Sequence, residues 1–536
     1  MQMRKTNTLT LVIPPKVDQL VASFSDSLRF LSEYLVVGIA FLVSLFGWRY
    51  YYDANLILSY NDSMSHLDIS RRVLDNLTPG IAQIGSVWLP LPHFLSLFFV
   101  WNDFLWHSGL AGSIISNLAF IGSAFFLYRL IILLTRDRVA GFLGAVIFAL
   151  NPNMIYMQSV PMTESLLIFF FIASTYYIFR WQEKDDYRHL IIAGLLTLLS
   201  TLTRYDGWML LAQIFLVVFL VAWRFGGWKR AESRLILFGT IALYGIVLWF
   251  IWNLLIFNDP LYFFNGPFAA KTQQLVFESE GRLFTKGELW NSIHVYLLAA
   301  VENNGSIISF LGGVGAILYF VKNKLSKEAL AISLLLSPLF FNIAALYLGH
   351  SIINLPDLPP YTLFNVRYGL MTLPAIALFA AFLSKKQRLL QIIFFIFLIM
   401  QTFLIFKDND VITVRDGIYG ASAQGMNETG SWLGAHAEKG LILVAASSQD
   451  SLIFQSGLPM DRFIHEGTGE YWKTSLKVPS TYASWIAMHH GDLVYRELSN
   501  NENFYKNYKK VYDGQFTDIF ELDRNTQKPL TINDLP

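Results

Sequence analysis

The chain contains 536 residues, of which 54% are hydrophobic and 15% are charged. A soluble protein carries about 25% charged residues, so this composition excludes an ordinary soluble globular protein. The formal net charge of +1 gives no indication of nucleic-acid binding, and we expect no nucleic-acid partner. No cysteine is present, which excludes disulfides, thiolate catalysis and cysteine-ligated metals and fits any redox compartment.

Apolar runs recur along the first 406 residues, and most approach the roughly 17–25 residues that a helix needs to cross a bilayer. We therefore expect an all-α polytopic membrane protein with about 11 transmembrane helices over residues 31–406. Residues 1–30 hold basic residues and no cleavable signal, which predicts a cytoplasmic N-terminal arm. The expected spans are 32–50, 113–134, 139–155, 160–180, 188–203, 209–223, 235–257, 304–321, 329–349, 368–384 and 389–406.

The charge of the connections predicts which helix ends are cytoplasmic. Lys and Arg concentrate in alternate loops, at 136–138, 180–188, 224–234, 322–327 and 385–388. Cytoplasmic loops carry the excess of these residues, so this set is expected inside a cell (inner or plasma) membrane. The extracytoplasmic connections are then 51–112, 156–162, 203–208, 258–303, 350–367 and the chain after 406.

The segment Trp88–Trp106 is apolar enough to be a further span, but it contains Pro90 and Pro92. A span there would also place Arg136 and Arg138 outside and reverse the basic loops that follow. We predict instead a helix that lies on the outer surface or dips into it.

The first external connection carries a compact polar segment, residues 60–74. Asp62 and His66 are four residues apart and share one helix face. A carboxylate can accept the proton of an attacking hydroxyl, and a histidine can orient that group or contact a phosphate. A solvated loop is the alternative interpretation. Further candidate substrate-binding side chains in this connection are Arg71, Arg72 and His93.

Acids and arginines also stand in the later external connections. Glu164 begins an apolar run, where a carboxylate is costly unless it is paired or faces water; an acid favoured by the helix dipole is the alternative. Arg204 suits bidentate phosphate binding. Asp206 is a further candidate for the substrate site, although a local ion pair with Arg204 is the better account of it.

Three more candidate substrate-binding residues lie further along the chain. Arg367 and Tyr368 stand at the start of an apolar run, where an arginine commonly extends to the interface. Lys271 lies in the long aromatic connection after residue 257, and a solvated loop lysine is its alternative interpretation.

After residue 406 the sequence becomes polar, which predicts a small extracytoplasmic α/β domain over 407–536. Buried-strand patterns are expected at 440–446, 484–488 and 518–522, with helix or loop at 501–512. The domain would cover the membrane site or meet an acceptor. His465, Glu466 and Glu470 could line a site there, although ordinary loop residues are the simpler interpretation.

The order of these motifs resembles that of the GT-C superfamily of membrane glycosyltransferases. The most similar group depends on polyprenyl-phosphate sugars and includes protein O-mannosyltransferases and the lipid A aminoarabinose transferase. The resemblance covers residues 30–410. The matching elements are Asn61–His66, Ile69–Arg72, Thr78–Gly80, Val87–His93, Asn151–Asn153 with Met162–Glu164, Asn258–Phe263, and Arg367–Tyr368 with Pro374.

The resemblance implies an inverting transfer of a sugar from an undecaprenyl- or dolichyl-type phosphate to an acceptor at the outer face. By this resemblance Asp62 matches the catalytic base, and Glu164 matches a second acidic position of the catalytic site. Arg204, Arg367 and Lys271 match positions that hold the lipid phosphate. The sugar, and the choice among a protein, lipid or glycan acceptor, stay open at this point.

The sequence requires no cofactor. It contains no HExxH motif, no P-loop and no Gly-rich dinucleotide turn. Asp62 and Glu164 could share a divalent cation, which takes oxygen ligands, but nothing requires one. Several relatives have an Asp-Glu pair in the first loop, where Asp62 is here followed by Ser63; this departure argues against a metal site built on adjacent carboxylates.

Two other functions fit an extracytoplasmic site. A transporter or flippase of lipid-linked sugars would place its polar residues near the middle of the membrane, often in repeated halves. A polymerase or ligase of lipid-linked glycans would use external loops, as a glycosyltransferase does. Because the ionisable residues gather at the outer ends of the spans, we favour an interfacial enzyme.

Overall fold

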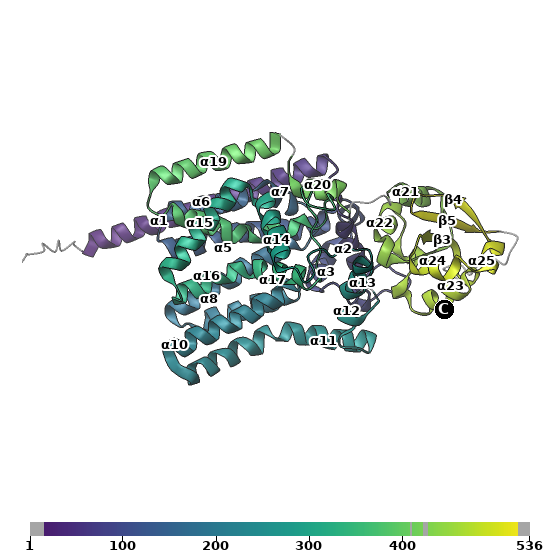
Figure 1. Cartoon of the computed structure of the whole chain (residues 1–536), viewed down its shortest axis with the longest axis horizontal. Helices are drawn as coiled ribbons and strands as arrows, with labels where there is room; N and C mark the ends of the chain where they lie inside the picture. The colour runs from purple at the N-terminus through teal and green to yellow at the C-terminus, as the bar shows by residue number, and fades with distance from the viewer. Residues whose placement is uncertain (1–14, 268, 408–409, 422–426, 524–536) are drawn as a thin grey trace, which may run out of the picture.

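The computed structural model describes residues 15–267, 269–407, 410–421 and 427–523. They form a bundle of long helices and, beyond one end of it, a smaller unit built on a β-sheet (Figure 1). Part of the expected N-terminal arm, residues 1–14, lies outside the described residues, and from Pro15 the chain is helical.

The protein is mostly helical, and the helices that build the bundle run side by side (Figure 1). They are α1 (Pro15–Asp53), α5 (Leu110–Thr135), α6 (Arg138–Ala149), α8 (Glu164–Lys184), α9 (Tyr187–Thr201), α10 (Asp206–Ala242), α11 (Tyr244–Phe257), α14 (Leu289–Asn304), α15 (Ser306–Asn323), α16 (Lys327–Ile332), α17 (Ser337–Tyr347), α18 (Leu373–Leu383) and α19 (Arg388–Lys407).

Shorter helices connect them. They are α2 (Asn61–Arg71), η1 (Ile81–Ile84), α3 (Leu91–Val100), α4 (Asp103–His107), α7 (Pro152–Met157), α12 (Tyr262–Asn265), α13 (Ala270–Ser279), η2 (Ser333–Leu336), η3 (Val366–Thr372) and α20 (Ile412–Tyr419).

Seven helical segments among the described residues are long and apolar enough to cross a membrane. One of them, Asp206–Phe257, contains two of the expected spans, 209–223 and 235–257. Gly227 lies between these two spans and breaks the helical geometry of α10, with φ 72° and ψ −175°. The chain reverses inside α10, and the second part of this helix continues into α11, which runs back along the bundle (Figure 1). The apolar helices α6 and α9 are shorter than a full crossing. The total of about 11 spans therefore stays a prediction.

The segment 88–106 forms two helices, α3 and α4, separated at Trp101 and Asn102. The ten residues of α3 are too few for a crossing of roughly 20 residues. This agrees with the expectation of a helix that does not span the membrane.

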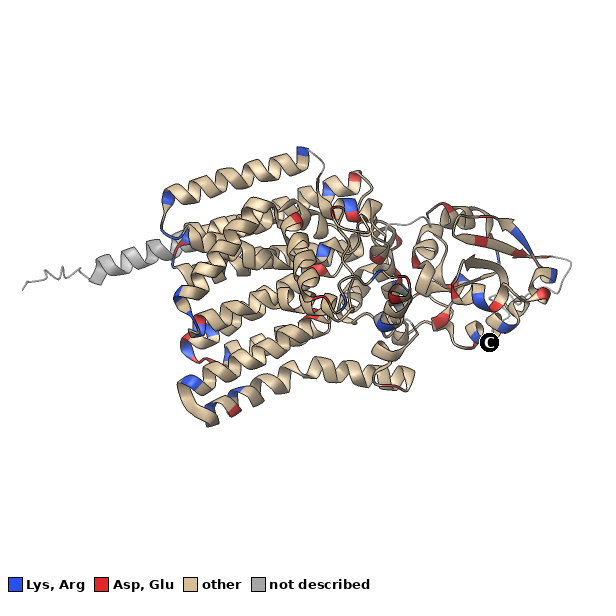
Figure 2. Ribbon diagram, in the orientation of Figure 1, with Lys and Arg blue, Asp and Glu red and all other residues tan. Residues whose placement is uncertain are grey.

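The basic loops lie together at the end of the bundle away from the β-sheet (Figure 2). Contacts between loops confirm this arrangement. Arg136 pairs with Glu183 at 2.9 Å, and Lys327 Nζ donates to the carbonyl of Gln182 at 3.2 Å. The bundle therefore has one strongly basic end, and the starts of α2, α8 and α10 lie at the other.

The C-terminal unit is a five-stranded sheet with strand order β2-β1-β3-β5-β4. The first three strands in that order are parallel, and β5 is antiparallel to both β3 and β4. The unit comprises α21 (Asn427–His436), β1 (Leu441–Val444), α22 (Ala446–Ser456), η4 (Met460–Arg462), β2 (Phe463–Ile464), η5 (Glu466–Thr468), α23 (Glu470–Lys477), η6 (Pro479–Thr481), β3 (Ala483–His489), α24 (Leu493–Leu498), α25 (Glu502–Asn507), β4 (Tyr508–Tyr512) and β5 (Thr517–Leu522).

Alternation along β1 explains how the sheet is buried on both faces. Ile442 and Val444 belong to one hydrophobic cluster, while Leu441 and Leu443 belong to another. The three expected strands are confirmed as β1, β3 and β5. The expectation for 501–512 was incomplete, because its last part is strand β4, which pairs with β5.

Glycines allow α15 and α18 to pack closely. A Cβ added at Gly312 would lie 2.9 Å from the Cα of Ile376, and one added at Gly315 would lie 2.2 Å from the carbonyl oxygen of Phe379. Small residues at such contacts let helix backbones approach in a membrane.

We expect Gly315→Ala to destabilise the protein by about 1–3 kcal/mol, because the added methyl group overpacks the α15–α18 contact. The matched control is Gly313→Ala, where an added Cβ meets nothing within 4 Å. Thermal unfolding in detergent should show a lower Tm for Gly315→Ala than for the control. Equal Tm values would contradict this account of the contact.

Candidate functional site

Asp62 lies in the first turn of α2, just after the chain leaves α1. Tyr60 precedes the helix in an extended conformation, with φ −81° and ψ 130°. Its hydroxyl donates to the carbonyl of Thr413 at 2.7 Å and contacts Asp416 Oδ2 at 3.1 Å. The start of α2 is thereby fixed against α20, a segment more than 350 residues later in the chain.

Arg367 lies at the centre of the cluster. Its Nη2 donates to Asp62 Oδ2 at 2.6 Å, and its Nε donates to Glu164 Oε1 at 3.1 Å. Asp416 Oδ2 is 3.9 Å from Nη1. The guanidinium also lies 4.9 Å from the ring centroid of Tyr60, which is within range of a cation–π interaction. Carboxylates from three separate parts of the chain therefore meet one arginine.

Arg204 extends the cluster on the side of α9 and α10. Its Nη1 donates to Glu164 Oε1 at 3.2 Å and to Thr163 Oγ1 at 3.1 Å, and its Nε donates to Asp206 at 3.3 Å. Its guanidinium lies 5.0 Å from the ring centroid of Tyr368. One oxygen of Glu164 thus accepts hydrogen bonds from both arginines.

Exposure divides the cluster into an inner and an outer part. The side chains of Glu164 and Asp416 are completely buried, and that of Arg367 is 3% exposed. The side chains of Asp62 and Arg204 are 31% and 20% exposed. The inner groups are therefore placed to hold the others, whereas Asp62 and Arg204 can reach a ligand.

Three polar atoms of the inner part make no hydrogen bond to a described residue. They are Arg367 Nη1, Glu164 Oε2 and Asp416 Oδ1. Buried polar atoms are normally satisfied, and those that are not point to strain or to a bound species. A free guanidinium N–H beside a carboxylate cluster is suited to an anionic oxygen.

A pair of histidines flanks the cluster. His66 Nδ1 and His93 Nε2 are 2.9 Å apart and share a hydrogen bond, and the ring centroid of Trp88 lies 4.3 Å from that of His66. Burial, followed by the nearby charges of Arg204 and Arg367, lowers the pKa of His66 to about 3. His66 is therefore neutral near pH 7 and contributes hydrogen bonding rather than charge.

Other predicted substrate-binding residues lie apart from this cluster. Arg71 pairs with Asp75 and Asp103 at 3.2 and 2.7 Å. Arg72 pairs with Asp450 of the C-terminal unit. Lys271 is exposed on α13, with its Nζ 4.9 Å from the ring centroid of Phe264. Their contacts with described residues are structural, and none of these contacts is to the Arg367 cluster.

Asp416 and Tyr60 also belong to the cluster, although the sequence did not indicate either of them as a site residue. The polar sequence after residue 406 was assigned to the C-terminal domain, although α20 packs back against α7 and η3. The backbone N–H and hydroxyl of Thr413 both donate to Asn153 Oδ1, which holds α20 in place. No sequence signal near Asp416 predicts this return.

In the described part of the chain, no group of three or more His, Asp or Glu side chains is placed to hold a metal ion. Asp62 and Glu164, which the sequence allowed to share a cation, instead both bond to Arg367. The guanidinium provides positive charge between them.

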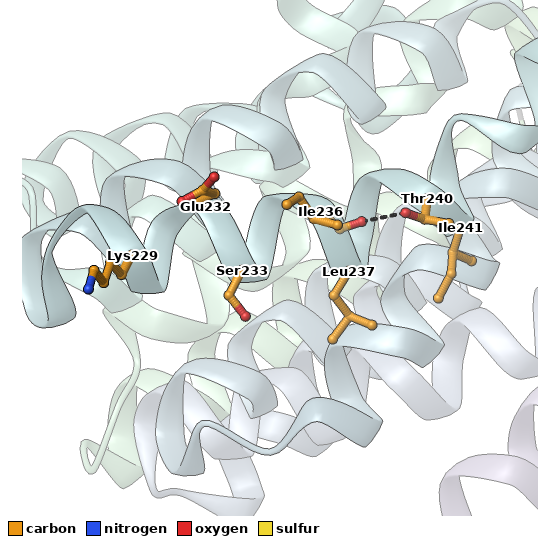
Figure 3. A pocket seen from close by; sticks show the side chains of 7 residues that line it. All are labelled: Lys229, Glu232, Ser233, Ile236, Leu237, Thr240 and Ile241. Atoms are coloured by element: carbon orange, nitrogen blue, oxygen red, sulfur yellow. Dashed lines mark hydrogen bonds between the residues drawn. The ribbon is translucent and has the colours of Figure 1, made fainter.

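A surface hollow along the second part of α10 has a different character (Figure 3). It is lined by Lys229, Glu232, Ser233, Ile236, Leu237, Thr240 and Ile241, all from one helix. Thr240 Oγ1 is bonded to the carbonyl of Ile236 at 2.8 Å. No ionisable residues from separate elements converge there, so the Arg367 cluster is the stronger candidate site.

A family model described as dolichyl-phosphate-mannose-protein mannosyltransferase matches residues 96–252. This stretch contains Glu164, Arg204 and Asp206 but neither Asp62 nor Arg367. No curated protein matches the sequence significantly.

Solved structures match over most of the chain. ArnT from Cupriavidus metallidurans bound to undecaprenyl phosphate has a TM-score of 0.52 at 12% identity, covering 91% of this chain and 97% of ArnT. The apo state gives a TM-score of 0.50 at 13% identity, covering 89% and 98%. The apo oligosaccharyltransferase of Archaeoglobus fulgidus gives 0.47 at 12% identity, covering 85% and 69%.

These findings confirm the resemblance to GT-C membrane glycosyltransferases that depend on polyprenyl-phosphate donors. The likeness to ArnT establishes the fold, and the family model that matches residues 96–252 is that of a mannosyltransferase. The mostly helical architecture with several apolar helices therefore agrees with the fold of ArnT.

We expect the stability of the protein to fall as the pH drops from about 6.5 towards 3, because unfolded His66 takes up a proton that the folded protein excludes. Each such histidine contributes up to about 1.4 kcal/mol per pH unit. His66→Asn should reduce this slope, measured as the Tm difference between pH 7 and pH 5. Identical slopes in wild type and variant would contradict the depressed pKa.

Proposed function

We propose that the protein is an inverting glycosyltransferase of the cell membrane. It moves a sugar from a polyprenyl-phosphate donor to an acceptor hydroxyl at the extracytoplasmic face. The observation that carries the proposal is the meeting of Asp62, Glu164, Arg204 and Arg367 at the end of the bundle opposite the basic loops. The positive-inside rule places that end outside the cytoplasm.

Asp62 acts as the general base. In the transfer, the acceptor oxygen attacks the anomeric carbon and gives its proton to Asp62, and the bond from that carbon to the phosphate oxygen breaks. Its electron pair leaves with the lipid phosphate. Because the attack is direct, the anomeric configuration inverts and no covalent intermediate is needed. Among the carboxylates bound to the two arginines, Asp62 has a partly exposed side chain, whereas Glu164 is completely buried.

Arg204 and Arg367 stabilise the leaving phosphate. Fixed cations aimed at developing negative charge are most effective where water is largely excluded. Arg204 is partly exposed, and Arg367 offers an N–H that no described residue accepts. ArnT, which shares the fold, has been crystallised with undecaprenyl phosphate, so a lipid phosphate is the anion that we assign to this site.

Glu164 has a supporting part in this scheme. Its Oε1 accepts from both arginines and fixes their spacing. A buried carboxylate with two guanidinium partners orients cations better than it removes protons. His66 of α2 and His93 of α3 are assigned to the acceptor or sugar side of the site as neutral hydrogen-bonding groups.

A transporter or flippase is less consistent with this arrangement. Transporters gather polar groups near the middle of the membrane. Here the cluster is built from helix ends: the starts of α2, α8 and η3 and the connection before α10. The acceptor can be a protein, a lipid or a glycan, and the last of these would make the enzyme a polymerase or ligase.

We expect Asp62→Asn to lower transfer by about 10²- to 10⁴-fold, the usual contribution of a general base. The assay follows radiolabelled sugar from undecaprenyl-phosphate mannose, glucose, galactose and arabinose into membrane acceptors. The control is Asp53→Asn, an exposed carboxylate at the end of α1 that pairs with Arg49. Full activity of Asp62→Asn with any accepted donor would remove Asp62 as the base.

We expect Arg204→Gln to weaken binding of undecaprenyl phosphate by roughly tenfold or more, as the loss of one charge-assisted contact of about 1.5–3 kcal/mol predicts. Lys286→Gln is the control, because Lys286 is an exposed cation paired with Glu278. Binding would be measured by intrinsic tryptophan fluorescence in nanodiscs. Equal affinities in the two variants would exclude Arg204 from the phosphate site.

A further inference from the structure

The C-terminal unit is attached to α2 by buried charges at the end of that helix opposite Asp62. Arg72, the C-cap residue of α2, pairs with Asp450 of α22. The side chains are only 11% and 14% exposed. The same short helix therefore carries the proposed base in its first turn and an ion pair to another unit at its end.

A second carboxyl group, that of Asp68, lies near Arg72, and burial together with the nearby Asp450 raises its pKa. Asp68 lies one helical turn before Arg72 and is completely buried, and neither of its oxygens is hydrogen-bonded to a described residue. Asp450 and Arg72 are the charges that act most strongly on Asp68. Removing one partner of a buried ion pair is strongly destabilising, because it leaves the other charge uncompensated.

Other ionisable groups face this pair. Glu466 lies near Asp450, but its carboxylate accepts from the backbone N–H groups of Ala446 and Ser447 at 2.9 and 3.2 Å. Burial lowers the pKa values of His93 and His465, which both face Arg72 and are therefore neutral. Burial raises the pKa of Asp450 to about 6, against the opposing effect of Arg72.

Contacts around the charges join α2 to the core of the C-terminal unit. Met64 and Leu67 of α2 belong to the same hydrophobic cluster as Leu452 and Phe454 of α22. Gln455 Nε2 contacts the sulfur of Met64 at 3.3 Å. Because α2 packs on both the bundle and the sheet unit, a movement of that unit would displace α2.

The first external connection contacts the C-terminal unit at the carboxyl edge of the parallel strands β1 and β2. Asp450 follows β1, and His465 and Gly467 follow β2. Asn76 bonds to His465 at 3.2 Å, and Gln83 Nε2 donates to the carbonyl of Gly467 at 2.8 Å. Open α/β sheets commonly bind ligands at this edge. Here the edge holds the first external connection of the membrane bundle.

We propose that Arg72 and Asp450 are positioning residues for the transfer reaction, through which the C-terminal unit fixes the placement of Asp62. The proposal rests on the proposed function, because it assigns the pair an effect on the base. Arg72 would thus position the base, whereas the sequence suggested that it contacts the substrate.

The consequence is a specific kinetic effect. A misplacement of about 1 Å in a reacting group can cost as much as 10²-fold in rate. Arg204, the partly exposed cation of the phosphate site, is held by Glu164, Thr163 and Asp206 rather than by α2. Arg367, the other cation of that site, bonds to Asp62 of α2 but also to Glu164 of α8, which holds it when α2 loosens. Loosening α2 therefore lowers kcat and leaves the KM for the lipid donor nearly unchanged.

The test compares Asp450→Asn with Glu470→Gln in the full-length protein in nanodiscs. Glu470 is a carboxylate of the same unit that is 83% exposed and pairs only with Lys473 of its own helix among the described residues. Two quantities are measured: transfer kinetics with the accepted undecaprenyl-phosphate sugar, and hydrogen exchange of the backbone amides of residues 61–72.

We expect Asp450→Asn to lower kcat about tenfold, with donor KM within twofold of wild type and faster exchange in α2. Glu470→Gln should match wild type in all three. Arg72→Lys keeps the charge and should retain most of the activity, whereas Arg72→Gln should behave like Asp450→Asn. This second pair of variants tests the contact from the side of α2.

Unchanged exchange in α2 in both Asp450→Asn and Arg72→Gln would overturn the proposal, as would faster exchange with normal kcat. An increased donor KM with normal kcat would also overturn it, because that result places the pair in donor binding. Full activity of Asp62→Asn, in contrast, would overturn the proposed function. The exchange measurement does not depend on activity, so the two failures are distinguishable.

Discussion

The burial of Arg367 among carboxylates is the constraint on which the rest of the structure depends. An ion taken from water into a largely dry site loses its hydration, and its partners must replace it. Asp62, Glu164 and Asp416 provide that replacement from three distant parts of the chain. Packing of α2, α8, η3 and α20 at one end of the bundle is therefore coupled to the neutralisation of a single guanidinium.

Burial also distinguishes the residues that support the site from those that can contact a substrate. Inner groups are completely or nearly completely buried, and their hydrogen bonds fix the geometry. Asp62 and Arg204 keep part of their surface accessible, at 31% and 20% of the side chain. An enzyme that stabilises a charged leaving group benefits from such a division, because preorganised dipoles and charges need little rearrangement during the reaction.

Helix α2 connects the membrane bundle to the C-terminal unit. One end of it contributes Asp62 to the cluster, and the other end contributes Arg72 to a buried contact with Asp450. The parallel strands β1 and β2 present their carboxyl edge to this helix and to the connection that follows it. A small α/β unit is thereby attached to the end of the helical bundle where the proposed chemistry takes place.

The sequence by itself determined the membrane character, the separation of basic from acidic connections, three strands of the sheet and the candidates Asp62, Glu164, Arg204 and Arg367. Local composition decides these features, since apolar length, loop charge and alternation are read over short windows. Only the tertiary structure decided that Arg71 and Arg72 serve ion pairs away from the cluster and that Asp416 returns to it. Which carboxylate neutralises a given arginine depends on contacts between residues hundreds of positions apart, and no short window contains them.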